Sequence, residues 1–238
     1  MLNELLDLIY PRFCYICNKS LKHSKNLYFC FSCWYKLPLI RKNLCLKCAM
    51  PMGEGIGVKK KCNDCNFGKF YFKQIRSAGK YKDSLRKVLL NFKFKGMVEL
   101  RHPLAALIYW QLKHYPFSGK IDLIIPVPMY HKQRIQRGYN QAELLADCLA
   151  KLMRIPCVTN ILIKIKETLP QSGLDRTQRE KNLTNKFIAT KKLKDKTVLL
   201  VDDIFTTGTT VNECSKALKK SNVKKIYVAT AAKSLTEY

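Results

Sequence analysis

The residues best suited to chemistry lie in the stretch VLLVDDIFTTGTT, residues 198–210. An aliphatic run leads into two adjacent aspartates, and a loop of threonine and glycine follows. A strand that ends at the crevice of an α/β fold places such residues where ligands bind. Backbone N–H groups, threonine hydroxyls and the positive end of a following helix suit a phosphate monoester. The carboxylates suit the hydroxyl groups of a sugar attached to that phosphate.

This phosphate loop predicts a ribose-phosphate site. The residues expected to hold the phosphate are Thr206, Thr207, Gly208, Thr209 and Thr210. Asp202 and Asp203 are expected to accept hydrogen bonds from ribose hydroxyls. The alternative is a helix capped by one threonine, beside solvated aspartates. Capping needs one such residue, and it does not explain the aspartates, the glycine and the threonines together.

Cysteines form a second chemical pattern, near the N-terminus. Four C-x-x-C pairs occur there: Cys14 and Cys17, Cys30 and Cys33, Cys45 and Cys48, and Cys62 and Cys65. Each pair can offer two thiolates from one tight turn, and two pairs complete a tetrahedral zinc site. The spacing therefore predicts two structural zinc ions. It leaves open whether sequential or interleaved pairs share an ion.

A catalytic zinc ion is the less favoured alternative. It would need an open position or a mixed ligand shell, and His23 is the only histidine in this segment. Aromatic residues among the cysteine pairs could stack on nucleic-acid bases or form a small core. They are Tyr15, Phe29, Phe31, Trp34 and Tyr35.

Strands and helices alternate after Gly68. The apolar pattern predicts strands over residues 73–81, 121–128, 158–165, 196–204 and 224–233. Helices are predicted over residues 84–95, 100–115, 138–153 and 209–220. Apolar strands separated by helices indicate a mostly parallel, Rossmann-like sheet covered on both faces. We therefore expect a double zinc-ribbon domain over residues 1–68 and an α/β domain over residues 69–238.

Lysine and arginine dominate the charged residues. The 238 residues include 44 Lys+Arg and 17 Asp+Glu, a formal net charge of +27. The excess occurs both before and after Gly68. Such a chain favours polyanions, including nucleic acid, phosphorylated metabolites and anionic lipid. The alternative explanation of the charge is that the whole proteome is rich in lysine, in which case the charge does not indicate a polyanionic partner.

The sequence predicts a cytoplasmic protein. No stretch approaches the ~20 apolar residues that span a bilayer. The start, MLNELLDLIYPRFC, carries acids where a signal peptide is basic, and is more typical of an amphipathic helix ended at Pro11. In that compartment the cysteines are expected to bind metal instead of forming disulfides.

The phosphate loop and its aspartates resemble the signature of type I phosphoribosyltransferases, which bind phosphoribosyl pyrophosphate (PRPP). Two further segments, IIPVPMYHKQRIQRGYNQAELLA and TLPQSGLDRTQREKNLTNKF, resemble the ComF family of competence-associated proteins. In that family a double zinc ribbon precedes a phosphoribosyltransferase-like domain. The resemblance covers nearly the whole chain and includes the helix end LLNFKFKG.

The resemblance implies further site residues. The cations available to the pyrophosphate are His131, Lys132, Arg134 and Arg137. Pyrophosphate also requires Mg²⁺, because it carries several charges. Residues 168–182 correspond to a mobile loop that covers the substrate, from which Arg179 would act in catalysis with Asp202 and Asp203. Lys93 fits a phosphate contact and a solvated helix end equally well.

Two functions follow from this resemblance. In the first, the protein is needed for DNA uptake in natural transformation, binds PRPP, and binds DNA through its basic surface and zinc ribbons. Single-stranded DNA is the expected form, and the inner-membrane uptake machinery is a further partner, where the protein would lie peripherally. In the second, it is an active phosphoribosyltransferase that uses Mg-PRPP in nucleotide or cofactor metabolism. The charge favours the first function, and no acceptor-binding loop is recognisable.

Overall fold

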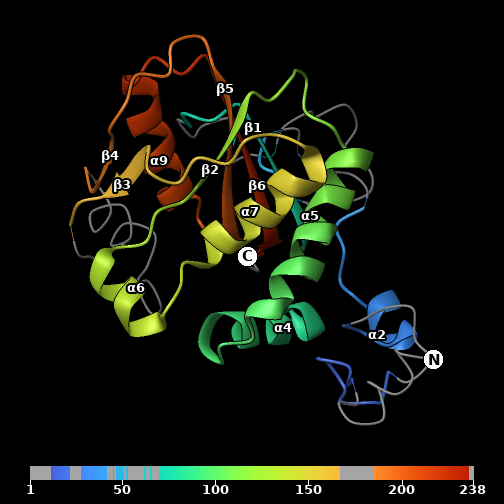
Figure 1. The fold of residues 1–238 in the computed structure, drawn as a ribbon. Coiled ribbons are helices and arrows are strands. Elements are labelled where there is room, and N and C mark those ends of the chain that lie inside the picture. The colour runs from blue at the N-terminus through green and yellow to red at the C-terminus, as the bar shows by residue number, and fades with distance from the viewer. Residues whose placement is uncertain are drawn as a thin grey trace.

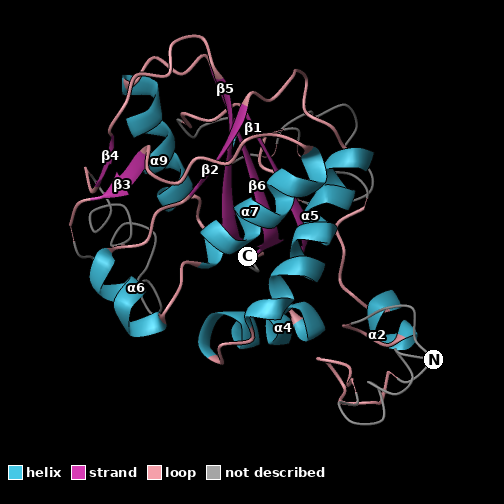
Figure 2. Ribbon diagram, viewed as in Figure 1, coloured by secondary structure: helices cyan, strands magenta, loops and turns pink. Residues whose placement is uncertain are grey.

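The computed structural model of the chain describes residues 12–21, 28–41, 45, 47–50, 52, 62, 65, 70–166 and 185–235. Its main sheet has the strand order β1-β6-β5-β2, and every neighbouring pair is parallel (Figures 1 and 2). The strands are β1 (Gln74–Lys80), β2 (Leu123–Pro126), β5 (Thr197–Phe205) and β6 (Lys225–Lys233). The predicted parallel sheet is confirmed.

Helices cover both faces of this sheet. α5 (Arg101–His114) and α7 (Gln141–Met153) cross in front of it in Figure 1. α9 (Thr209–Lys220) packs on the opposite face. Side chains of a strand alternate between faces, so β5 contributes to two cores. Leu199 and Val201 pack in the core beneath α5 and α7, and Val198 and Leu200 pack in the core beneath α9.

The remaining elements are short. α4 (Asp83–Phe94) and a 3₁₀ turn (Val98–Leu100) lead into α5, and α2 (Phe31–Tyr35) lies among the first cysteines. α6 (His131–Arg137) has no buried residue, which is why no apolar stripe predicts it. β3 (Leu162–Lys164) pairs antiparallel with β4 (Phe187–Ala189) in a separate sheet. The strand predicted over residues 158–165 is therefore outside the main sheet, and β4 is not predicted.

The cysteine-rich segment packs along the β1 edge of the main sheet. Leu39 forms an antiparallel bridge with Gly79, and the Ile40 N–H donates to the Ala78 carbonyl at 3.0 Å. This contact covers backbone groups that an edge strand would otherwise expose. The division between residues 68 and 69 stays a prediction. Among the described residues, no helix is long and apolar enough to cross a membrane.

Candidate functional site at the ends of β2 and β5

The sheet topology creates a crevice between β2 and β5. These strands are parallel neighbours, but the helices that next pack on the sheet after them, α7 after β2 and α9 after β5, lie on opposite faces. In an open α/β sheet, ligands bind at the carboxyl ends of strands at such a switch point. A cleft of about 900 Å³ lies there. Its lining includes Val127 and Pro128 after β2, and Asp202, Asp203 and Thr206 near the end of β5.

The predicted aspartate pair lines this cleft. Asp203 is 8% exposed, and Asp202 is partly buried. The Asp202 carboxylate accepts a hydrogen bond from the Asp203 N–H at 2.9 Å, and Asp203 accepts one from the Ile204 N–H at 2.8 Å. Burial raises the pKa of Asp202 well above its ordinary value, and the neighbouring Asp203 adds to that rise. The pair therefore places two interacting carboxyl groups at one wall of the cleft, where ionisation of Asp202 is disfavoured.

Lys93 balances part of this charge. Its ammonium, near the end of α4, lies 3.3 Å from an Asp203 carboxylate oxygen. The charge of Asp203 raises the pKa of Lys93, while burial opposes that rise. Lys93 also lines the cleft. The sequence could not choose between a site lysine and a solvated one, because the partner lies more than a hundred residues away. The structure assigns Lys93 to the site.

The phosphate loop joins β5 to α9. Gly208 is the N-cap residue of α9 and has a φ of 82°, a left-handed conformation that favours glycine. Glycine has no side chain to cap the helix, so a threonine N-cap does not account for this loop. The Thr207 and Thr209 hydroxyls lie 2.9 Å apart. Thr206 and Thr210 line the cleft.

The predicted pyrophosphate cations take different positions. Arg137 lines the cleft, with its guanidinium 5.2 Å from the centre of the Phe94 ring. Arg134 instead forms an ion pair with Glu143 at 3.0 Å and is not part of the cleft lining. Asn140, which the sequence left without a role, donates from its side chain to the Val127 carbonyl at 3.0 Å and so holds the opposite wall. Arg179 lies outside the described residues.

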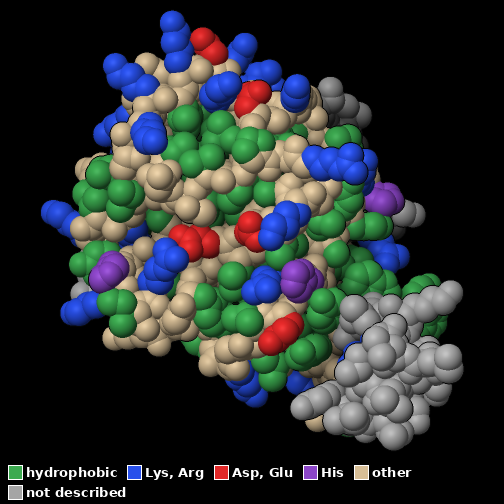
Figure 3. Space-filling model, in the orientation of Figure 1, with side chains coloured by type: hydrophobic (Ala, Val, Ile, Leu, Met, Phe, Trp, Pro, Cys, Tyr) green, Lys and Arg blue, Asp and Glu red, His purple; other side chains and the backbone are tan. Residues whose placement is uncertain are grey.

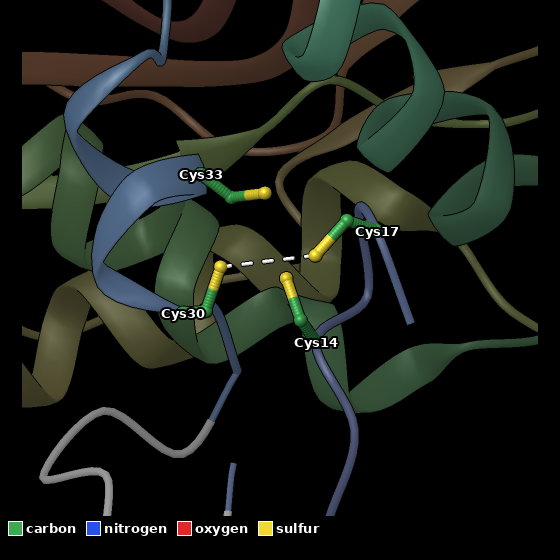
Figure 4. A group of neighbouring side chains, drawn as sticks. All are labelled: Cys14, Cys17, Cys30 and Cys33. Carbon is green, nitrogen blue, oxygen red and sulfur yellow. Dashed lines mark hydrogen bonds between the residues drawn. The ribbon is translucent and has the colours of Figure 1, made fainter. Parts of the chain in front are cut away.

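The cysteines form two four-residue groups, each from sequential pairs. Zinc site 1 denotes Cys14, Cys17, Cys30 and Cys33, and zinc site 2 denotes Cys45, Cys48, Cys62 and Cys65. In each group the sulfurs lie within 4.8 Å of one another, and those of site 1 point toward a common centre (Figure 4). The structure therefore favours sequential over interleaved pairing.

The sulfur separations suit zinc. Tetrahedral zinc with bonds of about 2.3 Å would hold its sulfurs about 3.8 Å apart. The Cys17 and Cys30 sulfurs are 3.7 Å apart, and those of Cys48 and Cys62 are 3.5 Å apart. With thiolate donors only, both groups fit structural zinc ions.

Comparisons with known proteins agree with this architecture. The double zinc ribbon domain matches residues 5–66, and the phosphoribosyl transferase domain matches residues 103–238. Competence protein F of Haemophilus influenzae is 32% identical over 215 residues, which cover 84% of this chain and 94% of that protein. Competence protein ComFC of Bacillus subtilis is 29% identical over 198 residues, covering 79% and 77%. DNA utilization protein YhgH of Escherichia coli K12 is 23% identical over 197 residues, covering 82% and 86%.

Among solved structures, the glutamine PRPP amidotransferase from B. subtilis matches with a TM-score of 0.40 and 16% identity, over 60% of this chain and 30% of that one. Purine phosphoribosyltransferase from Pyrococcus horikoshii matches with a TM-score of 0.36 and 22% identity, over 56% and 73%. The two domain matches, together with the fold and the cysteine groups, define a protein that joins a double zinc ribbon to a phosphoribosyltransferase-type domain. The chain belongs to the ComF family of competence proteins.

Proposed function

We propose that this protein serves DNA uptake in natural transformation and binds Mg-PRPP in the cleft between β2 and β5. The role in competence is supported by the relatives named Competence protein F and ComFC, and by the relatives named for DNA utilization. The observation that carries PRPP binding is that Asp202 and Asp203 share one cleft with Arg137 and with two residues of the phosphate loop, Thr206 and Thr210. The inner-membrane uptake machinery would be a partner, with the protein peripheral to it.

The cleft suits each part of PRPP. The phosphate loop would hold the 5′-phosphate at the start of α9, and Asp202 and Asp203 would accept hydrogen bonds from the ribose hydroxyls. The pyrophosphate would then face Arg137 and residues 127–129, the opposite wall. Mg²⁺ would accompany the pyrophosphate, and the aspartate oxygens are ligands of the kind it prefers. When PRPP binds, Lys93 would give up its ion pair with Asp203 and contact the ligand instead.

DNA binding is supported by charge and by exposed aromatic rings. Lysine and arginine side chains are spread over the face in Figure 3, in keeping with the net charge of +27. Among the aromatic residues named above, Phe29 is only 1% exposed, whereas Phe31 and Tyr35 on α2 are 82% and 72% exposed. Their ring centroids lie 6.2 Å apart. Exposed rings in a basic protein can stack on the bases of single-stranded DNA.

The alternative is an active phosphoribosyltransferase, which the same cleft would serve. A nitrogen nucleophile would add at ribose C1 with inversion as pyrophosphate leaves, and Asp202 and Asp203 would position the sugar. PRPP consumption, measured with and without single-stranded DNA, separates the two functions. We expect PRPP that is bound but not consumed. Steady release of pyrophosphate with a nitrogen acceptor would instead identify the metabolic enzyme.

A further inference from the structure

We propose that zinc site 2 holds the phosphate loop in place through Phe205 and Lys233, so that zinc at this site controls ribose-phosphate binding. The inference rests on the proposed PRPP site and adds positioning residues to it. Its evidence is a set of contacts that leads from Lys47, which lies between two ligands of site 2, through Phe72 and Phe205 to Gly208.

Phe205 connects the sheet to the phosphate loop. It is the last residue of β5, is 4% exposed, and directly precedes Thr206. A Cβ atom added at Gly208 would lie 2.5 Å from the Phe205 ring, far inside van der Waals contact. The ring thus fills the space beneath the turn at Gly208. Any displacement of Phe205 would change the path of the loop.

Lys233 lies beside Phe205 on the neighbouring strand. The two residues are register partners of β5 and β6, and the Lys233 ammonium is 4.2 Å from the centre of the Phe205 ring. Lys233 is only 2% exposed, and a buried ammonium is costly unless it is paired. The charged groups that stabilise this ammonium are the four cysteines of zinc site 2. Four thiolates around one Zn²⁺ would carry a net charge of about −2, which the Lys233 ammonium would partly neutralise.

Phe72 and Lys47 complete the connection. The Phe72 ring meets the Phe205 ring edge to face, with centroids 6.3 Å apart and an interplanar angle of 88°. Phe72 packs in the same core as the site 2 residues Cys45 and Cys48. Lys47 lies between these two ligands in the sequence, and its ammonium donates to the Phe72 carbonyl. Its own carbonyl accepts a hydrogen bond from the Ile75 N–H of β1 at 2.8 Å.

Zinc site 1 provides an internal comparison. Its buried ligand Cys14 packs in the core on the α5 and α7 face, away from the core that contains Phe205. Loss of one thiolate from either site therefore perturbs a similar metal site, but among the described residues only the cysteines of site 2 share a core with Phe72 and Phe205.

The experiment compares Cys62→Ser with Cys17→Ser in the full chain. Zinc content would be measured by elemental analysis, ribose 5-phosphate affinity by calorimetry, and loop order by amide hydrogen exchange over residues 205–212. Wild type should carry two zinc ions, and each variant should lose one. We expect Cys62→Ser to weaken the affinity for ribose 5-phosphate at least tenfold and to accelerate amide hydrogen exchange in the phosphate loop. Cys17→Ser should stay within twofold of wild type. Equal effects of the two variants, or no effect of Cys62→Ser, would overturn the proposal.

Substitutions at Lys233 separate its charge from its packing. Lys233→Met should weaken zinc retention against a chelator and accelerate exchange in the loop, whereas Lys233→Arg should restore both. Wild-type behaviour of Lys233→Met would contradict the role of the charge. If wild type does not bind ribose 5-phosphate, the proposed function fails, and hydrogen exchange in the Cys62→Ser and Cys17→Ser variants still tests the coupling.

Discussion

Asp202 occupies a position that opposes its own ionisation. Burial is the larger cause of its raised pKa, and the negative charge of Asp203 adds to it, while Lys93 partly offsets both. A group in this state favours its neutral form in the folded protein. A site that binds sugar hydroxyls needs acceptor oxygens. The Asp202 carboxyl would therefore be retained for binding at a cost in stability.

Replacement of Asp202 by asparagine should therefore stabilise the fold at neutral pH. The folded-state pKa of Asp202 is raised above the unfolded value, so the wild-type protein loses stability as pH rises between these two pKa values. The asparagine amide cannot ionise, and the advantage of Asp202→Asn should appear over that range and persist at higher pH. Thermal unfolding from pH 4 to pH 8 checks this. A lower melting temperature than wild type at neutral pH would contradict it.

Local residues of the site could be predicted from the sequence, whereas distant ones could not. Asp202, Asp203 and the phosphate loop are contiguous, so their types and order indicate a site before any fold is known. Lys93 and Asn140 act through partners on other elements, namely Asp203 and the Val127 carbonyl. No local pattern indicates these distant partners, although Asn140 also caps α7 locally by accepting a hydrogen bond from the Ala142 N–H. Arg134 shows the converse, because its pairing with Glu143 depends on how α6 meets α7.

At the scale of elements, the turn from β5 into α9 is the segment in which a side chain is most clearly excluded. Gly208 and Gly138 have φ values of 82° and 83°, but a Cβ at Gly138 would meet nothing within 4 Å. Replacement of either glycine by alanine imposes a left-handed alanine, which costs about 1–2 kcal/mol. Only Gly208→Ala also forces Phe205 to move.

We therefore expect Gly208→Ala to lower the free energy of unfolding by more than Gly138→Ala, which should lose about 1–2 kcal/mol. Urea unfolding of both variants measures the difference. Gly208→Ala should also weaken the binding of ribose 5-phosphate, because the Phe205 ring, once moved, displaces the phosphate loop. Equal losses of stability would mean that the Phe205 contact is easily relieved.

β5 and β6 were predictable as elements because their apolar runs are long and nearly continuous. β4 spans only three residues, and more than twenty mostly polar residues separate it in the sequence from β3, its pairing partner. The cysteine spacing predicted zinc ligation but not sequential pairing, because spacing does not show which turns meet. Ala49 adopts a left-handed conformation, with a φ of 56°, although it is neither glycine nor asparagine. The residue type therefore did not indicate this conformation.

At the scale of the whole molecule, charge and the exposed rings of α2 are expected to act together on DNA. If roughly 4–6 phosphates are neutralised, log affinity for single-stranded DNA should fall with log salt at a slope of about −3 to −4. Stacking adds a part that does not depend on salt. The double replacement Phe31→Ala with Tyr35→Ala should lower affinity by about 1–3 kcal/mol per stacked base, with the slope unchanged.

A salt titration of oligonucleotide binding tests this, with Tyr71→Ala as the control. Tyr71 is 43% exposed but lies outside the cysteine pairs. Wild-type affinity in the double variant would show that Phe31 and Tyr35 do not stack on the bases of DNA. Wild-type binding weaker than about 10⁻⁴ M at physiological salt would remove the DNA role.

Binding of Mg-PRPP to wild type and to the Asp202→Ala, Asp203→Ala double variant tests the central claim most directly. By calorimetry, wild type should bind one Mg-PRPP per chain, and ribose 5-phosphate should compete, because the phosphate loop holds its phosphate. The double variant loses two acceptors for ribose hydroxyls, and its affinity should fall by roughly 2–4 kcal/mol. Unchanged affinity in a folded, zinc-loaded double variant, or no binding to wild type, would contradict the account.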